Sequence, residues 1–85
     1  MVEGNHNVIR GWIVGVRRHK NVTFVDLGLY DRKEQFVIRE DLMDRLGDLV
    51  DRLRLESYVE IVYVKDGKDN AVRDIKIINE AKVGP

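Results

Sequence analysis

One feature of this 85-residue chain restricts its fold more than any other: its hydrophobic residues follow two different periods. Only residues 41–53 carry Leu, Met and Val at helical spacing, with charged residues between them. The rest of the sequence favours short extended segments, separated by connections rich in Gly, Asp and Asn. A chain of this length forms one domain with a thin core. We therefore expect a single domain over residues 1–85, built from strands and one helix.

The extended segments are residues 8–16, 22–27, 34–38, 58–64 and 71–78. The first of them, VIRGWIVGV, contains Gly11 and Gly15, and Gly inside a strand usually marks a bulge or a bend. Such a bend allows one strand to take part in two sides of a small barrel. Three strands, a helix and two further strands are typical of the OB-fold, a Greek-key barrel. The predicted fold class is therefore all-β, a five-stranded OB-fold barrel with its helix between the third and fourth strands.

Two-residue alternation predicts which side chains of residues 22–27 face the core. Val25 and Leu27 fall on one side and suit a core face. Phe24 then falls on the outer side, beside Asp26. In an OB-fold, this outer face of the second and third strands is the one that binds oligonucleotides or oligosaccharides.

The third extended segment, residues 34–38, alternates in the same way. If Phe36 and Ile38 are core residues, Gln35 lies on the outer side, on the same sheet face as Phe24. The only Trp of the chain, Trp12, is expected to pack in the barrel.

Net charge is zero, from fifteen basic and fifteen acidic residues, which counts against nucleic-acid binding by bulk electrostatics. The charges are unevenly placed, however. Arg17, Arg18 and Lys20 fall together early in the chain, whereas acidic residues gather in the expected helix. One basic face and one acidic face are compatible with a sum of zero.

Several chemistries are excluded or unsupported. The sequence has no Cys, so it has no disulfide and no thiolate metal site. We find no nucleophile–base set and no Gly-rich phosphate loop, and the two His residues, His6 and His19, lack a plausible ligand set. No apolar segment approaches the ~18 residues of a membrane span. We expect no catalytic residue, no metal, no cofactor and no membrane contact.

Motifs in a fixed order resemble a known family. The sequence has GW at 11–12, VR at 16–17, VTFVDL at 22–27 and Gln35 eight residues after that segment. Together they resemble the N-terminal anticodon-binding domain of class II aminoacyl-tRNA synthetases of the aspartyl and asparaginyl type. The segments RLESYVEI and IKIINEA, at 54–61 and 75–81, extend the resemblance over almost the whole chain.

The resemblance implies an OB-fold domain that binds a tRNA anticodon loop in the cytoplasm. It implies no enzyme activity, because the catalytic core of such synthetases is a separate, larger part; residues 81–85 stand where the linker to that core begins. The missing catalytic domain is then a possible partner. We expect a monomer, since dimer contacts of this family lie mainly in that missing part.

The resemblance also assigns roles to residues. It places an aromatic residue at Phe24 that stacks on the central anticodon base, and it implies that Arg17 and Gln35 contact anticodon bases. From the residues alone, each of the three has a simpler interpretation. Phe24 could be a core residue, Gln35 an ordinary exposed strand residue, and Arg17 a solvated turn residue.

Three further residues are candidates for RNA binding. Arg18 and Lys20 are expected to contact phosphates, or else only solvent. Tyr30 lies where the family usually carries an Arg-Asp pair, and it offers a second stacking surface. This departure and the zero net charge leave two alternatives to the anticodon-binding function: a protein-interaction or engineered binding scaffold on the same barrel, and a generic binder of single-stranded nucleic acid.

Overall fold

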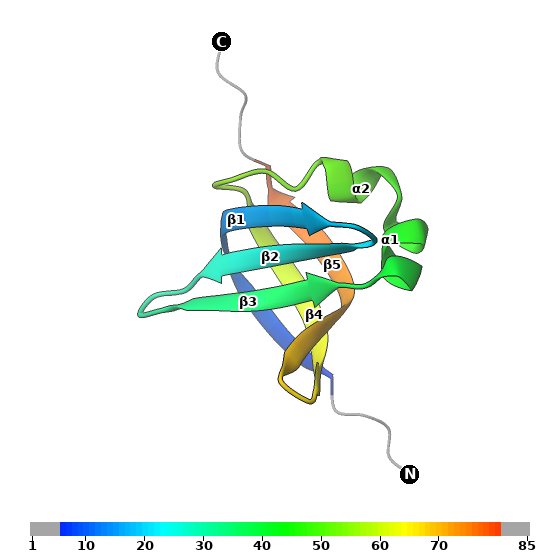
Figure 1. Ribbon diagram of the computed structural model, residues 1–85. Coiled ribbons are helices and arrows are strands. Elements are labelled where there is room, and N and C mark those ends of the chain that lie inside the picture. The colour runs from blue at the N-terminus through cyan, green and yellow to red at the C-terminus, as the bar shows by residue number, and fades with distance from the viewer. Residues whose placement is uncertain (1–5, 81–85) are drawn as a thin grey trace.

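Strands make up most of the computed structural model, which describes residues 6–80 (Figure 1). Residues 1–5 and 81–85 lie outside the described part, and with them the expected linker segment and the last residue of IKIINEA. The elements in order are β1 (Asn7–His19), β2 (Val22–Gly28), β3 (Lys33–Ile38), α1 (Glu40–Leu46), α2 (Asp48–Asp51), β4 (Tyr58–Asp66) and β5 (Asp69–Asn79).

The strands close into a barrel in the order β1-β2-β3-β5-β4. Neighbouring strands are antiparallel except for β3 and β5, which are parallel and meet at Val37 and Ala71. The helices lie between the third and fourth strands in sequence and cover one end of the barrel (Figure 1). The predicted OB-fold is therefore confirmed.

Strand β1 belongs to two sides of the barrel. Its first half pairs with β4 and its second half with β2, and the register shifts between Ile13 and Gly15. A Cβ atom on Gly15 would lie 2.9 Å from Oδ2 of Asp26, so a larger residue here would require the Asp26 carboxylate to shift. The bulge and bend predicted from the glycines are confirmed.

Strand β1 is longer than the prediction, which ended it at residue 16. The antiparallel ladder with β2 continues to the pair His19–Val22, so only Lys20 and Asn21 remain for the turn. The three residues 17–19 are therefore strand residues, and their side chains alternate between the two faces of the sheet.

The single helix predicted over residues 41–53 is wrong, because the chain breaks at Gly47. This residue has φ 57° and ψ −124°, a conformation that side chains disfavour, and it separates α1 from α2. No atom lies within 4 Å of the position of its absent Cβ, so the backbone angles, and not a close contact, account for this glycine. The helical spacing persists because both helices pack on the barrel, with Leu42 and Val50 buried.

The core confirms the alternation inferred for β2 and β3. Val25, Leu27, Phe36 and Ile38 are all fully buried. Trp12, by contrast, is 50% exposed, so its expected place inside the barrel is wrong. Within residues 6–80, none of the helices combines the length and the apolar character needed to cross a membrane.

Candidate nucleic-acid interface

One row of outward side chains crosses three neighbouring strands. Arg17 of β1 is the register partner of Phe24 of β2, and Phe24 is the partner of Val37 of β3. Partners in a ladder share a sheet face, so the three side chains lie beside one another on the outer face of the sheet, where Val37 is itself buried at 6% exposure. The residues on either side of Phe24 in β2, Thr23 and Val25, are fully buried, which fixes Phe24 on the outer face.

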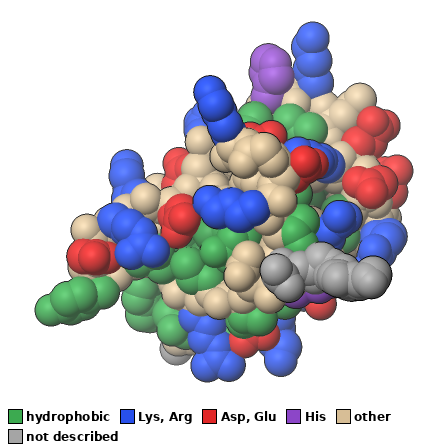
Figure 2. Space-filling model, turned by 90° about the horizontal axis from the view of Figure 1, so that it is seen from below, with side chains coloured by type: hydrophobic (Ala, Val, Ile, Leu, Met, Phe, Trp, Pro, Cys, Tyr) green, Lys and Arg blue, Asp and Glu red, His purple; other side chains and the backbone are tan. Residues whose placement is uncertain are grey.

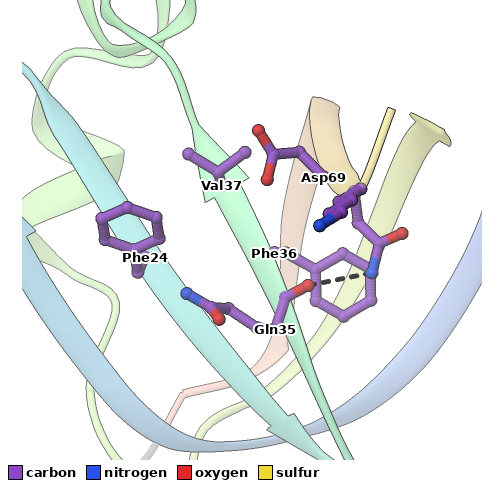
Figure 3. Close-up of a pocket in the computed structure, with 7 residues that line it drawn as sticks. Phe24, Gln35, Phe36, Val37 and Asp69 are labelled. Carbon is purple, nitrogen blue, oxygen red and sulfur yellow. Dashed lines mark hydrogen bonds between the residues drawn. The ribbon is translucent and has the colours of Figure 1, made fainter. Parts of the chain in front are cut away.

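A second row lies next to the first. Asp26 of β2 pairs with Gln35 of β3, and Gln35 is exposed. Figure 3 shows the side chains of Phe24 and Gln35 on the same side of the sheet, with the Gln35 amide directed toward the ring. The sheet thus brings together the aromatic ring and the amide that the sequence predicted to share a face.

Arg17 is held over this surface by two weak contacts. Its guanidinium carbon lies 5.2 Å from the centre of the Phe24 ring, within the range of a cation–π contact. Its Nη2 lies 4.0 Å from Oδ1 of Asp26, at the limit of an ion pair. Asp26 thus helps to orient Arg17. Both side chains are partly exposed, so the pair adds little to stability but sets where the positive charge lies.

A small hollow separates the row from the hairpin of β4 and β5 (Figure 3). Its volume is about 60 Å³, enough for a functional group or a water molecule but not for a whole base. The lining residues are Phe24, Gln35, Phe36, Val37, Lys68, Asp69 and Asn70. A base stacked on the outside of Phe24 would therefore direct only an edge toward this hollow.

Asn70 forms one wall of the hollow and was not predicted. It is 7% exposed, and its Nδ2 donates a hydrogen bond of 2.9 Å to the backbone carbonyl of Gln35. Its Oδ1 is buried with no hydrogen-bond partner. The sequence placed Asn70 at the end of a connection, where Asn is common for local reasons, so nothing in the pattern indicated a contact with β3.

The hairpin itself is fastened to β3 by Arg39, the residue that precedes α1. Its Nη1 donates to Asp66 at 2.6 Å and its Nη2 to Asp69 at 3.3 Å. The hydrogen bond with Asp66 raises the pKa of Arg39, and the same bond lowers the pKa of Asp66. The contact positions Asp69 and Lys68 beside the row, because it holds both ends of the hairpin turn.

The structure places the other three predicted RNA-binding residues away from this row. Arg18 is the partner of the buried Thr23, and its Nη2 donates to Asp51 of α2. Lys20 lies in the β1–β2 turn with a positive φ of 57°. Tyr30 is fully exposed in the β2–β3 connection, beside Trp12 rather than beside Phe24. Of the six predicted RNA-binding residues, the two neighbouring rows therefore bring together Arg17, Phe24 and Gln35 only, and these three side chains are called the row below.

Charge over the molecule is mixed. Figure 2 shows Lys, Arg, Asp and Glu side chains interspersed over the face seen from below, without a region of one sign. Among residues 6–80, no cluster of three or more His, Asp or Glu side chains could hold a metal ion. In the row, Arg17 is the basic side chain, so a contact with a polyanion there would begin with this residue.

Solved structures share this fold, although no family model and no curated protein matches the sequence. Asparaginyl-tRNA synthetase from Pyrococcus horikoshii, complexed with asparaginyl-adenylate, superposes with a TM-score of 0.79 and 16% identity over 98% of this chain. The OBody NL8, bound to hen egg-white lysozyme, gives 0.79 and 19% over 94% of this chain and 100% of its own. Rim1, a mitochondrial single-stranded DNA binding protein from S. cerevisiae, gives 0.76 and 11%, over 94% of this chain and 100% of its own.

The resemblance noted in the sequence thus recurs in three dimensions. The chain spans only 21% of the length of the Pyrococcus synthetase. At these identities the likeness establishes the fold, and the proteins that share it include a synthetase, a protein binder and a single-stranded DNA binder. The chain therefore has the OB-fold, which it shares with a domain of the Pyrococcus synthetase, with the OBody and with Rim1.

Proposed function

We propose that this domain binds unpaired nucleic-acid bases on the outer face of β1, β2 and β3, and that its ligand is a tRNA anticodon loop. The row formed by Arg17, Phe24 and Gln35 carries the proposal. It offers in one place a ring for stacking, a cation and an amide that both donates and accepts hydrogen bonds.

Each component of the row suits an unpaired base better than a duplex. The Phe24 ring lies on the sheet surface, where a splayed base can reach it, and such stacking is worth ~1–3 kcal/mol per base. The Gln35 amide lies beside the ring and can pair with the exposed edge of that base. Duplex bases are stacked and paired already, so they cannot use either group.

The proposed binding is weak and depends on salt. The net charge of the chain is zero, and two of the candidate phosphate contacts, Arg18 and Lys20, lie off the row. Few phosphates are therefore neutralised, and the loss of affinity with salt is shallow. One copy of the domain is enough for one loop.

We further propose that the domain has no catalytic activity of its own and acts in the cytoplasm. It spans about a fifth of the Pyrococcus synthetase, and the catalytic part of such an enzyme is the partner that we expect for it. Lys82 and its neighbours stand where the family resemblance expects the connection to that partner.

The decisive experiment is a titration of the domain with anticodon stem-loops for aspartate, asparagine and lysine, followed by NMR shifts of β1–β3 amides. We expect one of the three to bind more tightly than a hairpin of the same composition whose loop bases are paired. Equal binding of the paired hairpin, or shifts confined to other strands, contradicts the proposal.

A second candidate function is binding of a protein on the same face. The OBody that shares this fold is bound to lysozyme, and zero net charge suits a protein partner as well as a nucleic acid. A protein ligand that shifts the β2 and β3 amides, with no RNA affinity at low salt, would favour this function. A third candidate, general single-strand binding as in Rim1, predicts that single-stranded DNA of the loop sequence competes equally with the stem-loop.

A further inference from the structure

A second exposed surface lies on the first half of β1 and on β4, away from the row of Arg17 and Phe24. Even-numbered residues of β1 point outward here, because Ile13 is in the core and Ile9 packs against it. This surface consists of Val8, Trp12 and Val14 of β1, Tyr58 and Val62 of β4, and Tyr30 of the β2–β3 connection. We call it the aromatic face.

Four of its members are neighbours by register. Val8 pairs with Val62, and Trp12 pairs with Tyr58. The rings of Trp12 and Tyr58 are 4.7 Å apart at an interplanar angle of 54°. Trp12 nevertheless remains 50% exposed, Val8 62% and Val14 47%, so the packing within this face leaves most of it open to solvent.

The cations of the aromatic face are paired with carboxylates. Between its two apolar pairs lie Arg10 and Glu60, which are also register partners and form an ion pair of 2.8 Å. At its edge, Arg32 pairs with Asp31 at 3.1 Å and with Glu34 at 3.5 Å. Each cation here already has an acidic partner, so a phosphate chain would meet as much repulsion as attraction. An uncharged protein surface fits these charges, whereas a nucleic acid does not.

A protrusion and a hollow lie side by side on this face. Tyr30 is completely exposed at the tip of the β2–β3 connection. Beside it is a hollow of about 350 Å³, lined by Arg10, Gly11, Trp12, Gly28, Leu29, Tyr30 and Tyr58. Figure 2 shows hydrophobic side chains gathered on the side of the molecule that carries this connection in Figure 1.

We propose that the aromatic face binds a second copy of this chain, with Tyr30 of each copy seated in the hollow of the other. A twofold interface requires one patch that is complementary to itself. This patch satisfies that requirement in shape, by a protruding ring beside a hollow, and in charge, because it carries both cations and carboxylates that can pair across a twofold axis. Zero net charge also removes any overall repulsion between two copies.

The size of the face makes the dimer reversible. An aromatic side chain carries ~150–250 Å² of surface, so the fully exposed Tyr30 and the half-exposed Trp12 offer about 300 Å² together. Stable interfaces bury ~800 Å² per partner, and weak ones bury less. The monomer expected from the sequence is then the dilute form, and the dimer appears as concentration rises. The face is separate from the row, so dimer formation leaves Phe24 open.

Sedimentation velocity over a concentration series tests the proposal, and Trp12 supplies a second signal as the only tryptophan of the chain. We expect the weight-average sedimentation coefficient to rise with concentration while Trp12 emission shifts to shorter wavelength. Tyr30→Ser and Val8→Asp change exposed residues without core contacts, and each is expected to weaken association at least tenfold. Leu55→Ser, a matched change at another exposed apolar position, is expected to leave it unaltered.

Three results overturn the proposal. The first is a monomer at all concentrations up to about 1 mM, where a weak interface of this size would still associate. The second is association at wild-type strength in either Tyr30→Ser or Val8→Asp. The third is an equal loss in Leu55→Ser, which would indicate non-specific apolar contact. Circular dichroism of each variant checks that its fold is retained.

Discussion

The guanidinium carbon of Arg17 lies 5.2 Å from the centre of the Phe24 ring, on the outside of the barrel. The ring thus contacts a cation before any ligand arrives. An exposed cation–π contact is worth about 0.5–1 kcal/mol, and a base stacked on an aromatic ring is worth ~1–3 kcal/mol. A base therefore gains more from Phe24 than Arg17 does, and the guanidinium is free to move to the base or to its phosphate.

Phe24→Ala is expected to weaken binding of the preferred anticodon stem-loop by about tenfold to a hundredfold, because the stacking energy is lost. The fold should persist, since the Phe24 ring lies on the outer face while Val25 beside it fills the core. Fluorescence anisotropy with a labelled stem-loop measures the affinity. Phe24→Tyr, which keeps a ring, is the control and should bind within a few-fold of wild type. Equal affinity of the alanine variant would show that the ring does not stack.

Arg17→Gln is expected to reduce affinity a few-fold and to lower the slope of log affinity against log salt by about one, as for loss of one phosphate contact. The neighbouring Arg18→Gln is a matched control, because the Arg18 side chain bonds Asp51 of α2 and lies off the row. It should have the smaller effect on both quantities. If Arg18→Gln reduced affinity more than Arg17→Gln, the nucleic acid would have to pass the helix end at Asp51 and not the sheet face at Phe24.

The outer face of β2 and β3 was predictable because alternation in a half-buried strand is strict. Once Val25 is assigned to the core, Phe24 has no place but outside, and register carries the same logic to Gln35. Trp12 was mispredicted because size and apolarity favour burial, whereas the phase of β1 places it outward. The phase depends on where the bulge lies, and glycine positions alone do not fix that.

Tertiary partners account for the other omissions. The contact between Asn70 and the Gln35 carbonyl joins residues 35 positions apart, and the Arg39 contacts with Asp66 and Asp69 span 27 and 30 positions. No local pattern encodes such pairs. They arise because β3 and β5 meet in parallel at a single point, which only the closed barrel creates.

Asn70→Asp is expected to destabilise the domain by at least about 2 kcal/mol at neutral pH. The substitution replaces a donor that bonds the Gln35 carbonyl at 2.9 Å with a buried carboxylate that faces a carbonyl oxygen. Urea unfolding measures the loss. Asn79→Asp makes the same chemical change at an exposed position and should cost less than about 0.5 kcal/mol. Comparable losses in the two variants would mean that the Asn70 bond contributes nothing.

Asp66→Asn is expected to remove a pH-dependent part of the stability. The hydrogen bond from Arg39 lowers the pKa of Asp66 in the folded state below its ordinary value of 3.8. The unfolded state therefore binds the proton more readily, so the stabilisation is present at neutral pH and is lost as pH falls through 3.8 toward the folded pKa. Unfolding free energies of wild type and variant should differ above pH 5 and converge in acid. A constant difference across this range would exclude the linkage.

Gly47→Ala is expected to destabilise the domain by about 1–3 kcal/mol, through backbone strain alone. With φ 57° and ψ −124°, Gly47 occupies a region that residues with a Cβ disfavour, yet no atom lies within 4 Å of where that Cβ would be. Gly47→Asn tests whether the strain comes from the ψ angle of Gly47 as well as from its positive φ. Asn tolerates the left-handed helical region, but the ψ of Gly47 lies outside it, so Asn should cost about as much as Ala.

Thermal and urea unfolding measure the stability lost in both variants, with Asp48→Ala as the control for a neighbouring exposed change. A clear advantage of Asn over Ala would mean that the backbone here relaxes to the left-handed helical conformation, and that the break between α1 and α2 is softer than its angles indicate.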